Sequence, residues 1–257
     1  MHMRLSRVLK KLRSGQLASC IKINLADPRV TEIASMCGID CLWLDMEHVP
    51  SDWSVIENQI RSAKVYDVDT LVRVARGSYS DYIRPLEIDA TGIMVPHVMS
   101  LKDAKQVVWQ TRFHPVGRRP IDGGNVDGAY CMIDYPEYIK TANEQRFVIV
   151  QIEDPEPLDE LEEIAKLEGI DMLFFGPSDF SQGIGYPGQW DNPLIEQTRK
   201  RIAEVANANG KVAATVGSPA NIGKLIDMGY RFISMGADVV ALAAYFQQMV
   251  AEFERVS

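Results

Sequence analysis

Short apolar runs rich in β-branched and aromatic residues alternate along the chain with longer segments whose apolar residues recur at helical spacing. Most of the short runs are nearly continuous, which is typical of parallel strands covered on both faces. The longer segments predict helices, for example over Leu158–Leu167, Pro193–Ala208 and Ile222–Met228. The pattern predicts strands at Cys20–Asn24, Cys41–Asp45, Thr70–Val74, Gly92–Val95, Phe147–Ile152, Met172–Phe175, Val212–Val216 and Phe232–Met235.

One junction recurs before three of these strands, at Gly38-Ile39-Asp40, Gly169-Ile170-Asp171 and Gly229-Tyr230-Arg231. A glycine just past a helix adopts the left-handed conformation that turns the chain back toward a strand. Repeated helix–glycine–strand junctions indicate βα units in series, and about eight such units close into a barrel. The sequence therefore predicts an α/β protein with a (β/α)8 TIM-barrel fold, in a single domain spanning residues 1–257.

A long interruption, residues 97–146, separates the fourth and fifth predicted strands. It contains a predicted helix at Leu101–Thr111, a loop rich in Gly, Pro and Asp at His114–Tyr130, and a second helix near Tyr135–Asn143. The segment has no hydrophobic core of its own, so we expect an active-site insertion rather than a second domain.

The composition is that of a globular protein, with 46% hydrophobic and 24% charged residues among 257. A net charge of −8 and a pI near 5.1 argue against a nucleic acid or an anionic membrane as partner. No apolar run approaches the roughly 18 residues of a membrane span. The cysteines at positions 20, 37, 41 and 131 form no CxxC pair, so we expect buried, reduced thiols and a cytoplasmic location.

Reactive groups of (β/α)8 barrels gather at the carboxyl ends of the strands. Carboxylates, an arginine and histidines collect at those ends in this chain, rather than scattering over both ends of the barrel. They are found in Asp45-Met46-Glu47-His48, at Arg73, in Pro96-His97, in Gln151-Ile152-Glu153 and in Gly176-Pro177-Ser178-Asp179.

Glu153 and Asp179 end neighbouring predicted strands, so their carboxylates can converge. Two carboxylates without a His or Cys cluster suit a hard divalent ion such as Mg²⁺ or Mn²⁺, with water and substrate completing the coordination. The alternative is that they are surface acids or helix N-caps, and Asp179 before Phe180 fits an N-cap well. Spacing alone leaves both interpretations open.

His48 and Arg73 are candidates for acid–base and anion-binding roles. A histidine beside the carboxylates of Asp45 and Glu47 suits a general acid–base, although a structural histidine is the alternative. An arginine within the apolar run Thr70–Val74 needs an anionic partner, either substrate or a structural carboxylate such as Glu87. His97 and His114 each adjoin a proline in a loop, and we interpret both as structural.

At these positions the sequence resembles the HpcH/HpaI family of class II (metal-dependent) pyruvate aldolases, whose fold is the phosphoenolpyruvate/pyruvate type of barrel. The likeness runs from about Gly15 to the C-terminus. Its specificity lies in the order and spacing of several motifs: Asp45-Met46-Glu47-His48, Leu71-Val72-Arg73, Val95-Pro96, Gln151-Ile152-Glu153 and Gly176-Pro177-Ser178-Asp179-Phe180-Ser181.

The resemblance implies a role for each site residue. Glu153 and Asp179 would hold a divalent metal ion (Mg²⁺, Mn²⁺ or Co²⁺), which pyruvate chelates beside Gln151, Gly176, Pro177 and Ser178. Arg73 would hold the keto oxygen as it becomes an enolate. His48, oriented by Asp45 and Glu87, would transfer protons. The family also implies a homohexamer in which C-terminal helices are exchanged between subunits.

Two departures from the family pattern concern the acceptor. Gly117-Arg118-Arg119-Pro120 has proline where the family usually has glycine, and Lys22 stands where the family often has a large aromatic residue. We expect Lys22 to bind a carboxylate rather than to form an imine. Lys22, Arg118 and Arg119 near the barrel mouth would favour an acidic aldehyde as acceptor. Alternatively, Arg118 and Arg119 face solvent or pair with Asp122 and Asp127.

The leading hypothesis is a metal-dependent aldolase that cleaves or forms 4-hydroxy-2-oxo acids through a pyruvate enolate, with a 2-oxo acid and an aldehyde as its small-molecule partners. A second hypothesis keeps the scaffold but condenses oxaloacetate in a citrate-synthase-like reaction. A third is a barrel that binds a small acid without turning it over.

Overall fold

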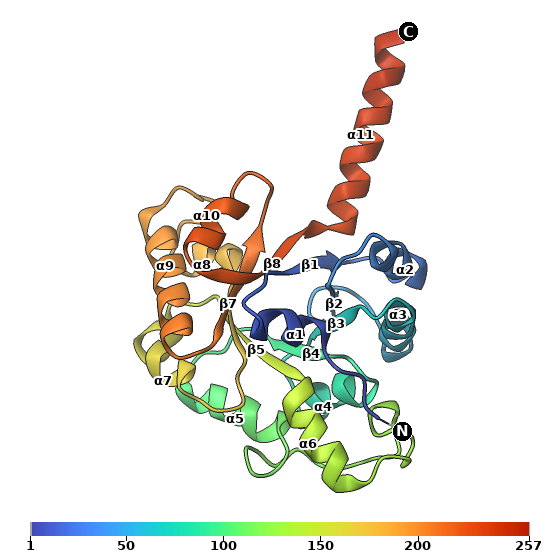
Figure 1. Ribbon diagram of the computed structural model, residues 1–257. Coiled ribbons are helices and arrows are strands. Elements are labelled where there is room, and N and C mark those ends of the chain that lie inside the picture. The colour runs from blue at the N-terminus through green and yellow to red at the C-terminus, as the bar shows by residue number, and fades with distance from the viewer. Residues whose placement is uncertain (1, 257) are drawn as a thin grey trace.

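Eight parallel strands close into a barrel in sequence order in the computed structural model, which describes residues 2–256 (Figure 1). Each predicted strand is present, with ends that differ by at most a few residues. This confirms the (β/α)8 TIM-barrel prediction. The strands are β1 Ala18–Ile23, β2 Cys41–Asp45, β3 Asp69–Arg73, β4 Gly92–Val95, β5 Phe147–Ile152, β6 Met172–Phe175, β7 Val212–Gly217 and β8 Tyr230–Ala237.

Helices connect successive strands and surround the barrel (Figure 1). The structure adds α8, a short helix directly after β6 that periodicity did not predict, and it shortens the helix predicted over Leu158–Leu167. The helices are α1 Arg7–Arg13, α2 Pro28–Met36, α3 Trp53–Val65, α4 Tyr79–Glu87, α5 Leu101–Thr111, α6 Tyr135–Gln145, α7 Leu161–Ala165, α8 Pro177–Gly183, α9 Pro193–Ala208, α10 Ile222–Asp227 and α11 Asp238–Val256, with 3₁₀ turns η1 Val126–Gly128 and η2 Glu156–Glu160.

The glycine junctions behave as predicted, since Gly38, Gly169 and Gly229 have φ values of +87°, +95° and +98°. Side chains that alternate along each strand then divide into two cores. One face packs outward against the helices, as Leu42 and Leu44 do in β2. The other face fills the barrel interior, together with Val8 and Leu9 of α1. The interior is therefore packed rather than open.

The long segment 97–146 begins at the barrel mouth, where His97 lies beside Glu153, but from Arg112 onward it does not form part of the mouth of its own chain, contrary to the prediction of an active-site insertion. Helix α5 returns to the amino ends of the strands, and the chain from Arg112 onward stays there. Arg112 donates to the carbonyls of Gly169 and Arg146, at 2.8 and 2.6 Å, and these residues precede β6 and β5. Arg146 in turn donates to Asp89, just before β4, at 2.6 Å.

Helix α11 projects away from the barrel at the end of the chain (Figure 1). It is fastened at its first residue, where the Asp238 carboxylate accepts hydrogen bonds from the backbone of Asn24 and Leu25 at 2.8 and 2.9 Å. Beyond that point its large apolar side chains, among them Val240 and Phe246, are exposed. No helix in residues 2–256 is both long and apolar enough to cross a membrane.

The four cysteines are all free. Cys20 and Cys41 are buried side by side on β1 and β2, as predicted. Cys37 and Cys131 are exposed, so the expectation of buried thiols is wrong for these two. Both lie in connections rather than in strands, where apolar neighbours do not cover them.

Candidate active site

The alternation of side chains along the strands carries polar residues to the top of the barrel interior. In β2, Trp43 belongs to the interior core, so Asp45 two residues later points the same way. Arg73 lies directly opposite Asp45 in the β2–β3 register. By the same alternation, Lys22 lies two residues after the inward-facing Cys20 of β1 and points the same way. Gln151 and Glu153 lie two and four residues after the inward-facing Ile149 of β5. Strand ends far apart in sequence thus meet in one place.

These side chains line a cavity of about 380 Å³ at the carboxyl ends of the strands. The cavity brings together nine residues singled out from the sequence, although its lining also includes Trp43, Phe174, Val216, Ser234, the end of β8 and Val240 of α11, which sequence reasoning missed. Trp43 could have been found from its inward position two residues before Asp45. The predicted residues in the lining are Lys22, His48, Arg73, Gln151, Glu153, Gly176, Pro177, Ser178 and Asp179, with Asp45 directly behind Lys22 and Arg73.

Glu153 is a buried carboxylate with an unusual environment. The backbone N–H of His97 donates to its Oε1 at 2.9 Å, and Gln151 Nε2 donates to its Oε2. Burial raises the pKa of Glu153 to about 7, and the negative charges of Asp179 and Glu47 add to that rise. Gly176 makes this arrangement possible, because a Cβ there would lie 2.6 Å from Glu153 Oε2 and 2.9 Å from Gln151 Nε2.

Asp179 occupies the first turn of α8 and faces the same cavity. The N-cap position of α8 is Gly176, and no side chain caps that helix, so Asp179 is not the N-cap that the alternative interpretation proposed. The Asp179 charge acts on Glu153. Two carboxylates that repel each other in a partly dehydrated cavity form a site that a cation would stabilise.

Asp45, Arg73 and Lys22 form a charged cluster over the ring of Trp43. Arg73 donates from Nε and Nη2 to Asp45 at 3.0 and 2.6 Å, and Lys22 Nζ lies 2.8 Å from Asp45 Oδ2. Both cations lie over the indole, at 4.8 and 5.4 Å from its centroid. Burial raises the pKa of Asp45, but Arg73 and Lys22 outweigh it and bring the value to about 2. The structural partner of Arg73 is therefore Asp45, not Glu87.

His48 stands at the cavity mouth with 59% of its side chain exposed. Its Nε2 lies 3.5 Å from Glu47 Oε2, and Arg73 Nη1 lies 3.0 Å from the same oxygen. The prediction that Asp45 orients His48 is wrong in this chain, because the carboxylate beside His48 is that of Glu47, while Asp45 pairs with Arg73 and Lys22.

Glu87 does not lie beside His48 either. It ends α4 at the amino side of the barrel, half-buried, and burial raises its pKa, opposed by the positive charge of Arg119. The prediction that Glu87 orients His48 is therefore wrong within one chain.

His97 was interpreted as structural, yet it lies beside the candidate site. Its backbone has φ +48°, which turns the N–H toward Glu153, and its Nδ1 lies 2.8 Å from Asp154 Oδ2. Burial lowers the pKa of His97, but the hydrogen bond to Asp154 and the charge of Glu153 more than offset this and raise it. The sequence feature that could have identified His97 as a site residue is its position just after β4.

Arg119 is buried at the opposite end of the barrel. It donates to Asp127 Oδ2 at 2.9 Å and to the Tyr138 hydroxyl at 3.2 Å, and it lies over the ring of Phe113. The prediction that Arg119 approaches the barrel mouth is wrong for this chain, whereas the alternative of a pair with Asp127 is confirmed. Arg118 likewise lies over Trp109 of α5.

Comparison with known proteins agrees with this geometry. A sequence profile of the HpcH/HpaI aldolase/citrate lyase family matches residues 20–244. A hydroxypyruvate/pyruvate aldolase of Roseovarius nubinhibens is 31% identical, over 94% of this chain and 94% of that protein. A 2-keto-3-deoxy-L-rhamnonate aldolase of Escherichia coli is 30% identical, over 95% of this chain and 92% of that protein. The crystal structure of the citrate synthase SbnG superposes with a TM-score of 0.88 at 28% identity, over 96% of each chain.

The match covers most of the barrel, including every strand end from which the cavity is built. Both relatives named above are aldolases. By fold, by sequence profile and by these relatives, the chain belongs to the HpcH/HpaI aldolase/citrate lyase family.

Proposed function

We propose that this protein is a divalent-metal-dependent pyruvate aldolase that makes or breaks a carbon–carbon bond at C3 of pyruvate, with 4-hydroxy-2-oxo acids as the condensed form. The observation that carries the proposal is the pairing of Glu153 and Asp179 in one cavity with Arg73 and Gln151. The names of the aldolase relatives support the same reaction class.

The residues present fit a divalent ion. The candidate protein ligands are the carboxylates of Glu153 and Asp179, and hard cations prefer oxygen ligands. No cluster of three or more His, Cys, Asp or Glu that could hold a metal occurs among residues 2–256. Water and a chelating 2-oxo acid would therefore supply the remaining ligands. Gln151 Oε1 is buried without a hydrogen-bond partner in the described part of the chain, which leaves an acceptor for such a water. When bound, the ion would polarise the keto group of the substrate as a Lewis acid.

The other side chains support enolate chemistry. Arg73 is held rigidly by Asp45 and stacked on Trp43, so its guanidinium offers fixed positive charge to an oxygen that becomes anionic. An arginine has five N–H donors, so the hydrogen bonds of Arg73 to Asp45 and its ion pair with Glu47 leave other donors for substrate. His48, exposed at the cavity mouth, is placed to exchange protons with substrate or water. Lys22 adds a second cation for the pyruvate carboxylate.

Exchange of the C3 protons of pyruvate with deuterium tests this proposal without knowledge of the acceptor. We expect exchange that requires Mg²⁺, Mn²⁺ or Co²⁺, stops in excess chelator and is lost in Glu153→Ala. A matched control is Glu204→Ala, on the exposed face of α9. Exchange at the full rate in excess chelator would exclude a metal-dependent reaction.

A citrate-synthase-like condensation is the second candidate, because a citrate synthase shares the fold over 96% of both chains. Lys22 also favours it, since a second cation near Arg73 could face a second carboxylate of oxaloacetate. Product mass after incubation with metal, a 2-oxo acid and varied acceptors separates the two reactions. A barrel that only binds a small acid would yield neither product nor proton exchange.

We also propose that the protein forms a homo-oligomer, a hexamer as the family resemblance implies, in which α11 packs on neighbouring subunits. The exposed apolar side chains of α11 support this, because large exposed apolar surfaces mark interaction sites.

A further inference from the structure

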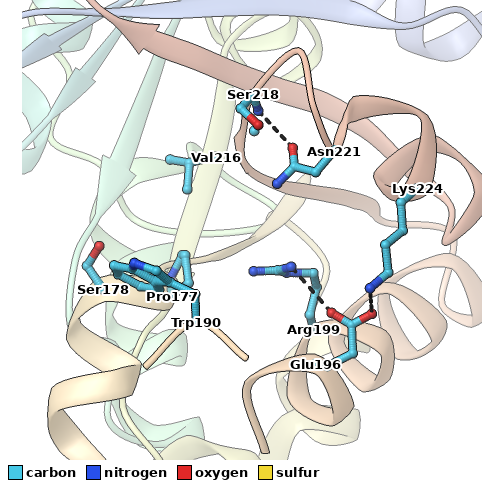
Figure 2. A pocket seen from close by; sticks show the side chains of 10 residues that line it. Pro177, Ser178, Trp190, Glu196, Arg199, Val216, Ser218, Asn221 and Lys224 are labelled. Atoms are coloured by element: carbon cyan, nitrogen blue, oxygen red, sulfur yellow. Dashed lines mark hydrogen bonds and ion pairs between the residues drawn. The ribbon is translucent and has the colours of Figure 1, made fainter. Parts of the chain in front are cut away.

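A second cavity, of about 480 Å³, lies beside the first. Its walls come from the start of α8, from α9, from the end of β7 and from the loop that leads to α10 (Figure 2). The two cavities share Pro177, Ser178, Val216 and Gly217 in their linings. A molecule with one end beside Glu153 could therefore extend past Val216 into the second cavity.

The second cavity has an excess of positive charge. Arg199 Nη1 lies 3.4 Å from Glu196 Oε2, and Lys224 Nζ pairs with the other oxygen of the same carboxylate (Figure 2). Two cations thus share one anion, which leaves one positive charge without a counter-charge in the lining. This excess stands against the overall charge of −8.

Hydrogen-bond donors in this cavity are directed inward. The Arg199 side chain is only 15% exposed, and its buried Nε has no hydrogen-bond partner among the described residues. Asn221 Oδ1 accepts from the backbone N–H of Ser218 at 2.8 Å, so its amide nitrogen is the atom that faces the cavity. Figure 2 shows the Arg199 guanidinium reaching from α9 toward the space below the Asn221 amide. The end of the Arg199 guanidinium and the Asn221 amide nitrogen are therefore the donors that an acceptor on a ligand would meet in this cavity.

We propose that this second cavity is an anion-binding subsite that holds a carboxylate or phosphate at the far end of the acceptor aldehyde. The inference rests on the proposed aldolase function, which places the reacting carbon in the first cavity. Val216 and Trp190 supply apolar walls for the carbon chain, and Arg199, Asn221 and Lys224 bind the anion. Loops after the seventh and eighth strands of (β/α)8 barrels commonly form phosphate sites, and Asn221 lies in the loop after β7.

Binding of unreactive anions tests the subsite without any turnover. Inorganic phosphate and succinate, titrated separately into metal-free protein by calorimetry, distinguish the two anion classes. We expect Arg199→Gln to weaken binding of the preferred anion on the order of 10-fold, as for a lost charged hydrogen bond. Lys224→Gln, at a more exposed position, should weaken it about 3-fold. Glu196→Gln should strengthen binding about 3-fold, because it removes the competing carboxylate.

Two neighbours on α9 provide matched controls. Arg201→Gln and Lys200→Gln remove the same charges from outside both cavities, so they should leave anion binding unchanged. Anion affinity that is equal in wild type, Arg199→Gln and Glu196→Gln would overturn the inference, whether or not the protein is an aldolase.

Kinetics then tests the role in acceptor choice. The same variants are assayed with two anionic acceptors, succinic semialdehyde and glyceraldehyde 3-phosphate, and with two neutral acceptors, butanal and glyceraldehyde. We expect Arg199→Gln to lower kcat/KM about 10-fold for the preferred anionic acceptor only. Pyruvate C3 exchange should stay at the wild-type rate in each variant. A wild-type protein that shows no pyruvate C3 exchange would count against the aldolase. Equal losses of kcat/KM for charged and neutral acceptors in the variants would count against the subsite.

Discussion

Replacing Glu153 with glutamine should stabilise the metal-free protein while it abolishes metal binding. Burial holds the pKa of Glu153 at about 7 in the folded protein, against an ordinary value of 4.5. A carboxyl group whose pKa is raised by folding does not change the free energy of unfolding well below pH 4.5, where it is protonated in both the folded and the unfolded state. As the pH rises, the unfolded chain releases its proton first, and the folded state becomes progressively less stable.

The two pKa values set the size of this effect. Since each unit corresponds to about 1.4 kcal/mol, the ionised Glu153 lowers the free energy of unfolding by about 3 kcal/mol at pH 8 and by about 1 kcal/mol at pH 5. Glu153→Gln removes the charge and keeps the shape. Its amide can still accept from His97 N–H, and the Gln151 amide can turn so that its unpartnered oxygen accepts from the new NH₂ group.

Urea denaturation in excess chelator measures the effect. Glu153→Gln should raise the free energy of unfolding by up to about 3 kcal/mol at pH 8 and by clearly less at pH 5. Glu204→Gln, at an exposed position on α9, is the control and should change little at either pH. With Mg²⁺ in place of the chelator, the wild type should be stabilised and Glu153→Gln should be unaffected. A variant that is less stable than wild type at pH 8 would refute the conclusion that Glu153 is an uncompensated buried charge.

Three further predictions follow from contacts elsewhere in the structure. Arg73→Lys should lower pyruvate C3 exchange on the order of 10²-fold, because a point charge cannot keep the paired bonds to Asp45 and still bind an enolate; an unchanged exchange rate would show that the role is misassigned. Arg119→Met should lower the free energy of unfolding in urea by about 3–5 kcal/mol, because it leaves the buried Asp127 carboxylate without its ion-pair partner and with only the neutral donors of Tyr138 and Gly128; an unchanged free energy of unfolding would show that this ion pair does not stabilise the fold. Truncation after Ala237 should reduce the molar mass seen by light scattering, and a folded wild-type monomer would exclude an oligomer joined through α11.

The sequence determined the fold because its signals are local. Continuous apolar runs, helical periodicity and glycines just past helices each depend on a few neighbouring residues, and together they predicted every strand. The candidate site was largely predictable for a related reason. In a (β/α)8 barrel the carboxyl ends of the strands always meet, so the residues that follow the strands, such as Glu153 and Asp179, had to lie close together.

Only the tertiary structure decided which charges pair and which end of the barrel a loop occupies. Asp45 and Arg73 are 28 residues apart and meet through strand register, which sequence spacing does not reveal. Arg119 looked like a mouth residue, but α5 carries the chain back to the other end, where Arg119 pairs with Asp127. The pocket of Arg199 and Lys224 was likewise hidden, because it brings together two helices that ordinary amphipathic patterns describe well. Such contacts depend on the packing of elements distant in sequence, and a pattern read along one chain contains no information on that packing.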